Sequence, residues 1–288
     1  MNTSAGQAPD WAARIRALDR AARNERLRVI AWQISLLLLL LGTWEFGTRI
    51  AWLAKNINLF DPFFVSRPSR VLAQLVEWTC GAKAVQFWPH LLSTLSSTLV
   101  GLTIAVASGF AVGMLFSQRR RLARVLSPFI VALNSLPRIA FVPLITMVFG
   151  LGMASKVVTA WFIVFFLVFF NTFKGASSVE WELLEFCRTL GASERQITWT
   201  VRVPKALSWT FAALPNAVSF SLIGVVLSEF VGSTKGMGYL IIVALSTLNS
   251  AEMFAALTVL SVVGVSLVML FRMLERRVLR WAPELREL

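Results

Sequence analysis

Residues 178–207, SVEWELLEFCRTLGASERQITWTVRVPKAL, form the longest polar interruption between two strongly apolar blocks after residue 90. Apolar side chains recur in this stretch at the spacing of one helix face, at Val179, Leu183, Phe186 and Leu190. Gly191 is placed to take the left-handed conformation that ends such a helix. Ser193 and Gln196 have the spacing of a capping box, which starts a second helix, and Pro204 limits how far that helix can run undisturbed. We therefore expect two short helices broken at Gly191.

The composition places this stretch in a membrane protein. The chain has 288 residues, of which 57% are hydrophobic and only 15% charged, and its mean hydropathy is +0.69. Apolar runs of about 20 residues are long enough to cross a bilayer as helices. We predict an all-α membrane protein with six transmembrane helices, at about 29–52, 90–116, 126–149, 155–173, 208–230 and 253–271. Glycines in the second span predict close helix packing there, at Gly101, Gly109 and Gly113.

The segments between and beyond these spans are more polar. Residues 1–28 form a basic tail that we expect to be retained, because the apolar run after it is too long for a signal peptide; one arrangement for this tail is a helix lying on the membrane. Residues 53–89 form a loop in which Val71, Leu72, Leu75 and Val76 predict a short helix packed on the bundle, and 231–252 form a Gly-containing polar stretch. Residues 272–288 form a second basic tail.

Lysines and arginines predict the orientation. Twenty of the 28 fall on one side of the predicted topology, in the two tails, in 117–124 and in 174–207. The positive-inside rule assigns that side to the cytoplasm. Both termini and the 178–207 loop are therefore expected in the cytoplasm. The net charge of +13 is then mostly explained by the basic residues of the cytoplasmic segments. No sequence pattern of a nucleic-acid-binding domain accompanies it.

The sequence lacks the residues of a catalytic centre. The one histidine, His90, lies at a span edge, and no Cys/His cluster has metal-ligand spacing. No phosphate-binding loop of the G-x-x-x-x-G-K-[ST] kind is present. If ATP powers this protein, another polypeptide must bind it.

Polar side chains inside the predicted spans are the candidates for a solute pathway, because burying them in lipid is costly. Arg138 lies between Pro137 and Pro143 in the third span, where proline opens the helical backbone. It is either a gate along the pathway or a structural partner of a carbonyl or of a carboxylate such as Glu229. The other candidates, each also suited to a helix–helix hydrogen bond, are Asn134, Asn171, Asn216, Ser219 and Glu229.

The 178–207 loop resembles the cytoplasmic EAA loop of ABC importer permeases. That pattern has Glu-Ala-Ala, three residues, Gly, and a Leu-Pro pair about a dozen residues on; here Phe186 and Cys187 replace the alanines and Val203 the leucine. Three more stretches are similar to the nitrate, sulfonate and taurine branch of that family: DPFFVSRPSRVLAQL (61–75), LPRIAFVPLITMVFGLGMASK (136–156) and LSEFVGSTKGMGYLI (227–241). The resemblance covers roughly residues 30–275.

The resemblance implies a type I ABC importer permease fold in a bacterial inner membrane. It implies that two copies enclose one pathway, that cytoplasmic ATPase subunits bind ATP and Mg, and that a periplasmic binding protein delivers a small solute, with an anion such as nitrate, a sulfonate or taurine favoured. The chain itself would hold no cofactor and be no enzyme. Coupling to the ATPase would fall to Glu185, Arg188, Gly191, Ala192 and Pro204.

Two alternatives stay open. A secondary transporter or channel would need no ATPase, and inverted repeats with broken helices are its expected pattern. An intramembrane enzyme would need a buried acid–base or metal constellation. The loop could also be an ordinary interfacial helix that anchors to lipid, and a related second permease chain could replace one copy of a homodimer.

Overall fold

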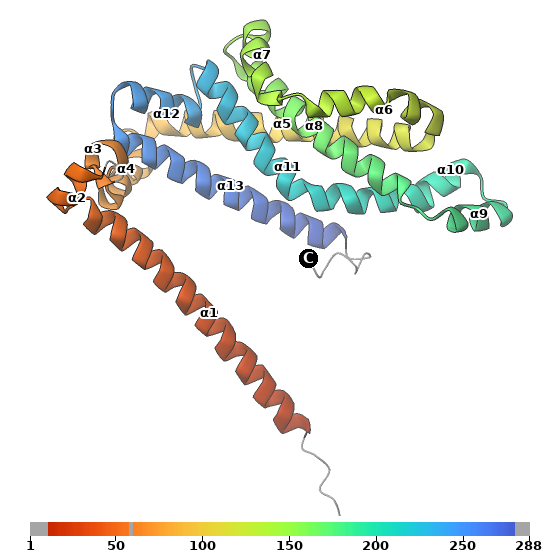
Figure 1. Cartoon of the computed structure of the whole chain (residues 1–288), viewed down its shortest axis with the longest axis horizontal. Coiled ribbons are helices and arrows are strands. Elements are labelled where there is room, and N and C mark those ends of the chain that lie inside the picture. Colours follow the sequence, from red (N-terminus) through yellow and green to blue (C-terminus); the bar gives the residue numbers. More distant parts are fainter. Residues whose placement is uncertain (1–10, 58–59, 280–288) are drawn as a thin grey trace, which may run out of the picture. The chain divides into compact units, whose positions relative to one another are not determined.

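The computed structural model describes residues 11–57 and 60–279, and every regular element in these ranges is helical (Figure 1). The chain divides into two compact units, residues 1–70 and residues 71–288. The first unit holds α1 (Trp11–Gly47), α2 (Ala51–Asn56), α3 (Pro62–Val65) and the start of α4 (Pro68–Cys80).

In the first unit, α1 runs without interruption from the basic tail into the first candidate span, Arg23–Gly47. The described part of the tail is therefore not a separate helix lying on the membrane, and the span ends five residues earlier than the predicted 29–52. Glu45 stabilises that end by accepting hydrogen bonds from Arg49 and from the backbone N–H of Ser69. Residues 1–10 of the tail lie outside the described residues.

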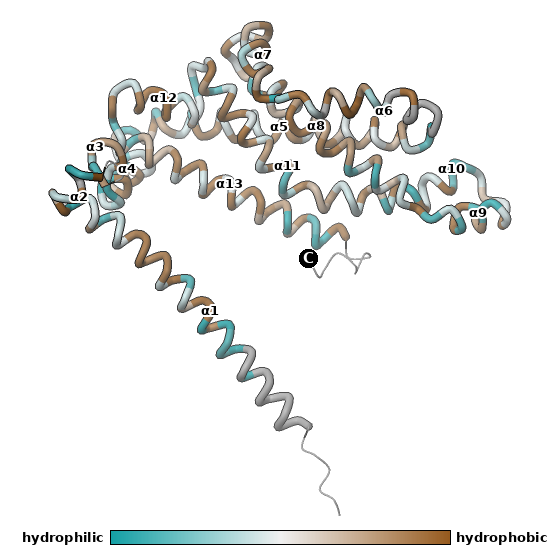
Figure 2. Tube along the Cα trace, in the orientation of Figure 1, coloured by the Kyte–Doolittle hydropathy of each residue, from teal (hydrophilic) through white to brown (hydrophobic). Residues whose placement is uncertain are grey.

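In the second unit, three helices form the centre of the bundle: α5 (Ala84–Gln118), α8 (Met153–Ser177) and α11 (Val203–Val231). α8 packs along both α5 and α11, and α13 (Ser250–Val278) packs on α11 (Figure 1). All four are candidate membrane spans. They extend beyond the predicted limits by one to seven residues at each end, and Figure 2 shows the apolar character of α13 and the polar α9–α10 end.

Glycines set the spacing between the central helices. A Cβ added at Gly109 would lie 2.9 Å from the Cβ of Val168 on α8, and one at Gly113 would lie 2.8 Å from the Cβ of Thr172. Gly101 meets Ala160 in the same way. The predicted close packing at these three positions is confirmed, and it follows from the small side chains that membrane helices use to approach each other.

The predicted third span, 126–149, is wrong as a single helix. The chain forms α6 (Arg120–Ser135), a 3-10 turn at Arg138–Phe141 and α7 (Val142–Phe149), with a bend of 75° between Ser127–Leu133 and Arg138–Phe149. Pro137 disfavours the helical conformation of the residue before it, and Leu136 is extended at φ −67°, ψ 137°. The described chain thus has five candidate spans, or six if this bent pair counts as one.

The stretch 231–252, expected to be polar, contains an apolar helix, α12 (Met237–Ser246). Its buried face, which includes Met237 and Ile241, packs against α13 and against Val71 of α4. The helix predicted around 71–76 is thereby confirmed as α4, with Val71 buried, although Leu72 and Val76 are exposed.

Candidate functional site

The loop between α8 and α11 begins with α9 (Trp181–Thr189), whose end is shaped by Gly191. Gly191 has φ +80°, in the left-handed region. Its N–H donates to the carbonyl of Arg188 (2.9 Å), and the N–H of Ala192 donates to the carbonyl of Cys187 (3.0 Å). These two bonds form a Schellman motif, which satisfies the last carbonyls of the helix. The predicted conformation of Gly191 is confirmed, while its part in coupling stays a prediction.

The predicted capping box is also confirmed at the start of α10 (Glu194–Ile197). Gln196 N–H donates to Ser193 Oγ, and Ser193 N–H donates to the Gln196 side chain (2.8 Å). The helix is disturbed just before Pro204 but does not end there. A π-helical turn at Thr198–Arg202 carries the backbone from α10 into α11, so that Glu194–Val231 is one helical run. Pro204 is the second residue of α11, directly after this turn.

Arg188 ties the two helices together across the Gly191 turn. Its guanidinium lies 2.8 Å from Glu194 at the start of α10, 3.4 Å from Glu185 one turn back, and 5.3 Å from the ring centre of Trp181. The hydrogen bond to Glu194 raises the pKa of Arg188. Among the described residues, Glu185 pairs through its side chain with Arg188, and 53% of that side chain is exposed.

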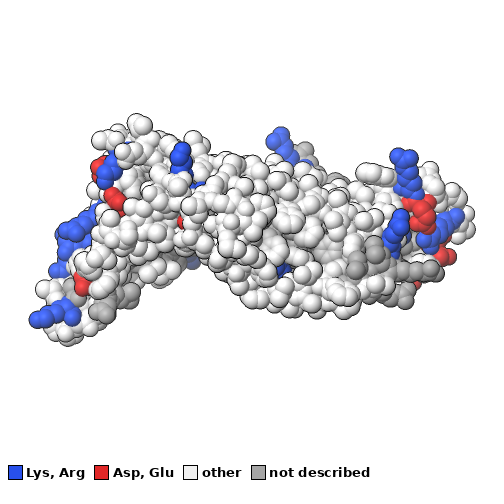
Figure 3. Space-filling view, turned by 90° about the horizontal axis from the view of Figure 1, so that it is seen from above, with Lys and Arg blue, Asp and Glu red and all other residues white. Residues whose placement is uncertain are grey.

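α9 leaves most of its apolar face uncovered. Leu184 is buried at 4% exposure and attaches the helix, but Phe186 and Leu190 are 61% and 71% exposed. Leu183 and Trp181 are exposed as well. Charged side chains gather at the end of the unit where α9 and α10 lie (Figure 3). Glu185 and Arg188 on α9 belong to them. The surface thus combines exposed apolar side chains with charged ones.

At the other ends of α8 and α11, Glu229 lies in a buried polar cluster. Its carboxylate is 3.0 Å from Lys156 Nζ and accepts hydrogen bonds from Thr94 Oγ1 (2.8 Å) and from the N–H of Gly238 (2.8 Å). Lys156 also donates to the carbonyl of Lys235. The side chains of Lys156 and Glu229 are 2% and 0% exposed, so the pair is fully enclosed.

This cluster fixes the start of α12. The N–H of Met237 donates to Thr94 Oγ1 (2.8 Å), and the N–H of Gly236 donates to Nδ1 of His90 (3.0 Å), whose ring stacks on Tyr239. Gly236 has φ +134°, and a Cβ there would collide with the Glu229 carboxylate. Lys156 is not among the candidate residues predicted from the sequence, although a lysine just inside an apolar span is a signal for a buried partner.

Arg138 does not pair with Glu229. Its Nη1 donates to the carbonyl of Ile163 on α8 (3.0 Å), and its guanidinium lies 5.0 Å from the ring centre of Phe166. Of the two roles left open for Arg138, this contact matches that of a structural partner of a carbonyl; whether Arg138 also gates the pathway is not decided by it. The side chain of Asn134 lies outside those that the structure describes.

The remaining pathway candidates are not brought together. Asn171 bonds the carbonyl of Leu167 in its own helix (2.8 Å). Asn216 and Ser219 lie on one exposed face of α11, and Ser219 bonds the carbonyl of Pro215. Among the described residues no group of three His, Cys, Asp or Glu side chains could hold a metal ion.

Known proteins share this architecture and sequence. Residues 88–280 match the family described as "Binding-protein-dependent transport system inner membrane component". The riboflavin transport system permease protein RibX of Chloroflexus aurantiacus is 31% identical over 85% of this chain and 88% of its own length. The taurine transport system permease protein TauC of Escherichia coli is 27% identical over 91% of this chain and 98% of its own.

Among solved structures, a chain of the MetNI methionine ABC transporter in an inward-facing conformation superposes with a TM-score of 0.56. The likeness covers 66% of this chain and 93% of that one at 21% sequence identity, and it confirms the predicted type I importer fold. The match to the family extends over the α5, α8, α11 and α13 bundle and over both ends of the α9–α10 loop. The chain therefore belongs to the binding-protein-dependent transport system inner membrane component family, the permease subunits of ABC importers.

Proposed function

We propose that α9 and α10 are the surface by which this permease docks on a cytoplasmic ATPase subunit, which binds ATP and Mg. The observation that carries the proposal is the uncovered apolar face of α9, formed by Leu183, Phe186 and Leu190 and rimmed by Glu185 and Arg188. An apolar patch with a charged rim is typical of a protein interaction site. A lipid-anchoring helix also combines an apolar face with a charged one, so copurification of an ATPase subunit is the measurement that separates the two roles.

The loop is built to transmit movement. The Schellman motif at Gly191 and the Arg188–Glu194 ion pair hold α9 and α10 as one piece. α10 continues through the π-helical turn into α11, and α8 ends three residues before α9 begins. A displacement of α9 by the ATPase would therefore reach both central helices directly. Rigid-body rocking of α8 and α11 would then switch the pathway between its two faces.

We further propose that two copies of the chain enclose the pathway, with the exposed face of α11 lining it. Ala212, Asn216, Ser219 and Ile223 follow one another at helical spacing on that face. Polar groups on a membrane helix are costly unless they face protein or water. Asn216 and Ser219 are thus placed to contact the solute or the second copy.

The solute that we propose is a small anion. Taurine and aliphatic sulfonates are named for relatives that are 27% and 29% identical, whereas riboflavin is named for another at 31%. Arg138, half-buried at the bend between α6 and α7, is the candidate cation on the pathway. Arg138→Gln should reduce uptake of a sulfonate at least tenfold and Arg138→Lys less; equal uptake by all three proteins in proteoliposomes would remove Arg138 from the pathway.

The orientation proposed is that of a bacterial inner-membrane protein with both termini and the α9–α10 loop in the cytoplasm. A periplasmic binding protein would then meet the residues 53–89 and 231–252. Cysteine substitutions at Thr247 and Ser193, made in a chain whose free cysteines Cys80 and Cys187 are replaced by serine and tested with a membrane-impermeant thiol reagent on intact spheroplasts, check this orientation. Labelling of the Ser193 site rather than the Thr247 site would reverse it.

The decisive experiment is copurification of the tagged chain from detergent-solubilised membranes. We expect an ATP-hydrolysing subunit to accompany the wild-type chain and to be lost from Glu185→Ala/Gly191→Val. The matched control is Glu77→Ala/Gly150→Val. Gly150 has φ +79° and ψ −176°, a conformation that is essentially restricted to glycine, and nothing lies within 4 Å of an added Cβ, so the control carries at least as much backbone strain away from the docking surface.

Two outcomes would count against the proposal. If the control loses the ATPase as well, the loss reflects general destabilisation and not docking by α9. If the wild-type chain is stable alone and carries solute without an ATPase, the result supports the secondary-transporter alternative instead.

A further inference from the structure

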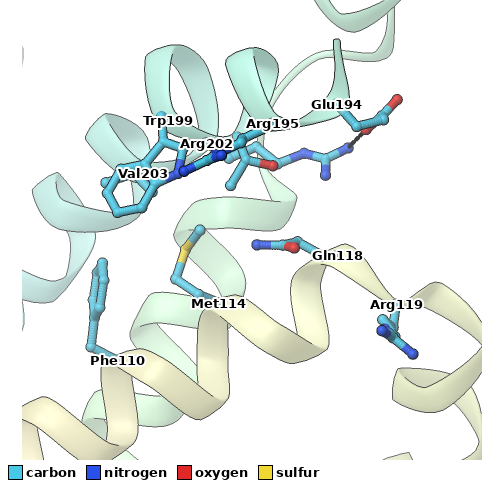
Figure 4. A pocket seen from close by; sticks show the side chains of 10 residues that line it. Phe110, Met114, Gln118, Arg119, Glu194, Arg195, Trp199, Arg202 and Val203 are labelled. Atoms are coloured by element: carbon cyan, nitrogen blue, oxygen red, sulfur yellow. Dashed lines mark ion pairs between the residues drawn. The ribbon is translucent and has the colours of Figure 1, made fainter.

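A cavity of about 550 Å³ separates the last turns of α5 from the helical run that begins with α10. Phe110, Met114 and Gln118 form the α5 wall, and Arg195, Trp199 and Arg202 lie opposite (Figure 4). All of them belong to the second unit of the chain. The α9–α10 docking surface adjoins the cavity, because Glu194 both lines it and pairs with Arg188.

The cavity changes character along its length. Phe110, Trp199 and Val203 lie toward one end, and Gln118 and Arg119 lie toward the other (Figure 4). The apolar end is nearer the middle of α5, a candidate span, whereas the polar end is at the last residue of that helix. The lining is therefore apolar at the end toward the membrane interior and polar at the end toward the aqueous surface.

The charge of the lining is unbalanced. The lining holds three arginines, Arg119, Arg195 and Arg202, and a single carboxylate, that of Glu194; Arg119 and Arg195 are exposed. Glu194 is already engaged by Arg188 at 2.8 Å, and Arg202 lies farther from it, at 3.8 Å. Among the described residues, no carboxylate is within ion-pair distance of Arg119 or Arg195. The cavity thus has cationic groups to spare for an anionic ligand.

We propose that this cavity binds one anionic phospholipid of the cytoplasmic leaflet. Its phosphate would lie among Arg119, Arg195 and Arg202, and the upper part of an acyl chain would lie along Phe110 and Met114. Anionic lipids concentrate in that leaflet and attract basic groups at its surface, and tryptophan favours the same interface. A free inorganic phosphate would fill only the polar end. The proposal rests on the orientation proposed above. A lipid in this cavity would contact both α5 and the ATPase-docking loop and so connect them.

The test is native mass spectrometry of the tagged chain purified with its ATPase, titrated with phosphatidylglycerol or with phosphatidylcholine. We expect one tightly held phosphatidylglycerol per chain, and at least a tenfold weaker apparent affinity in Arg195→Gln/Arg202→Gln. Arg276→Gln/Arg277→Gln removes two exposed arginines from the end of α13 and should leave this affinity unchanged. Phosphatidylcholine should bind the wild-type chain at least tenfold more weakly than phosphatidylglycerol does.

Several results would overturn the proposal. Equal weakening in both double variants would reduce the effect to general surface charge, and equal binding of the two lipids would remove the role of the anionic headgroup. Displacement of the lipid by millimolar inorganic phosphate, with phosphate then retained, would make the cavity a free-anion site.

Two further measurements separate folding and docking from lipid binding. Arg195→Lys/Arg202→Lys keeps both charges and should retain the lipid; if the Gln variant fails to fold, Arg119→Gln replaces it, with the same expected direction. Copurification of the ATPase is scored separately. If no ATPase copurifies with the wild-type chain, the docking proposal is refuted. If the ATPase copurifies but no lipid is bound, only the lipid site is refuted.

Discussion

Replacing Gly191 by valine tests the proposed coupling loop most directly. At φ +80° a residue with a Cβ is strained by about 1–2 kcal/mol, and a β-branched side chain by more. No atom lies within 4 Å of a Cβ built at Gly191, so collision adds nothing to this strain. Valine can relieve it by abandoning the left-handed turn, which breaks the two bonds of the Schellman motif, each contributing about 0.5–1.5 kcal/mol.

The change is local, because the turn is exposed and the bundle is held elsewhere. We therefore expect Gly191→Val to reach the membrane in normal amounts but to uncouple ATP hydrolysis from solute uptake in proteoliposomes. A turn weakened by about 2 kcal/mol is populated roughly 30-fold less relative to its alternatives, so the ratio of solute carried to ATP hydrolysed should fall at least tenfold.

A graded series separates backbone strain from side-chain size. Asparagine tolerates the left-handed region, so Gly191→Asn should stay near wild type, and Gly191→Ala should lie between Asn and Val. Gly150→Val, which is strained at least as strongly at φ +79° and ψ −176°, serves as the control for expression and thermal stability. Wild-type coupling in Gly191→Val, or an Asn variant as defective as the Val variant, would refute the reasoning.

Three other predictions concern the bundle itself. Lys156→Met leaves the Glu229 charge buried without its cation and should lower the free energy of unfolding by about 3–5 kcal/mol; Lys156→Met/Glu229→Gln should recover at least half of this loss in thermal unfolding in detergent, and no recovery would contradict the pairing. Gly109→Val places a side chain where even a Cβ would lie 2.9 Å from the Cβ of Val168. We therefore expect the free energy of unfolding to fall by about 1–3 kcal/mol and little monodisperse protein to be recovered. A wild-type yield would show that the two helices can separate freely. The hydrogen bond from Lys83 to Glu252 raises the pKa of Lys83, so the stabilisation is complete below the unfolded pKa and is lost as pH rises through the raised value; the Tm difference between wild type and Lys83→Gln should be small and constant up to about pH 10 and should shrink above it, and a difference that vanished by pH 8 would refute the pairing.

The conformation of the α9–α10 loop could be predicted from sequence because its determinants are local. Gly191 ends α9 through bonds to residues at most five positions back, and the capping box joins Ser193 to Gln196. The disturbance near Pro204 was predicted, but its form was not. The backbone passes through a π-helical turn at Thr198–Arg202 and stays helical, and a sequence pattern does not reveal the extra residue in that turn.

The cluster around Glu229 could not be predicted, because its partners are far apart in sequence. Lys156 is 73 residues from Glu229, and Thr94 is 135 residues from it. α12 was missed for the same reason, because hydrogen bonds to the distant helices α5 and α11 fix its start. It is also short and follows Gly236. The bend between α6 and α7 was half-anticipated, since Pro137 predicts an opened backbone but not a turn of 75°.

The glycine contacts between α5 and α8 have a mechanical consequence. Helices that touch backbone to backbone cannot slide or bend independently, so the central helices act as one stiff arm with the docking loop at one end and the Glu229 cluster at the other. The 25 residues of α8 give this arm a length of about 37 Å at about 1.5 Å per residue. A tilt of only about 10° then sweeps the far end through about 6 Å, which is comparable to one helical turn of about 5.4 Å. A small tilt of the central helices, started at the loop, would thus move their far ends far enough to open a passage for a small molecule.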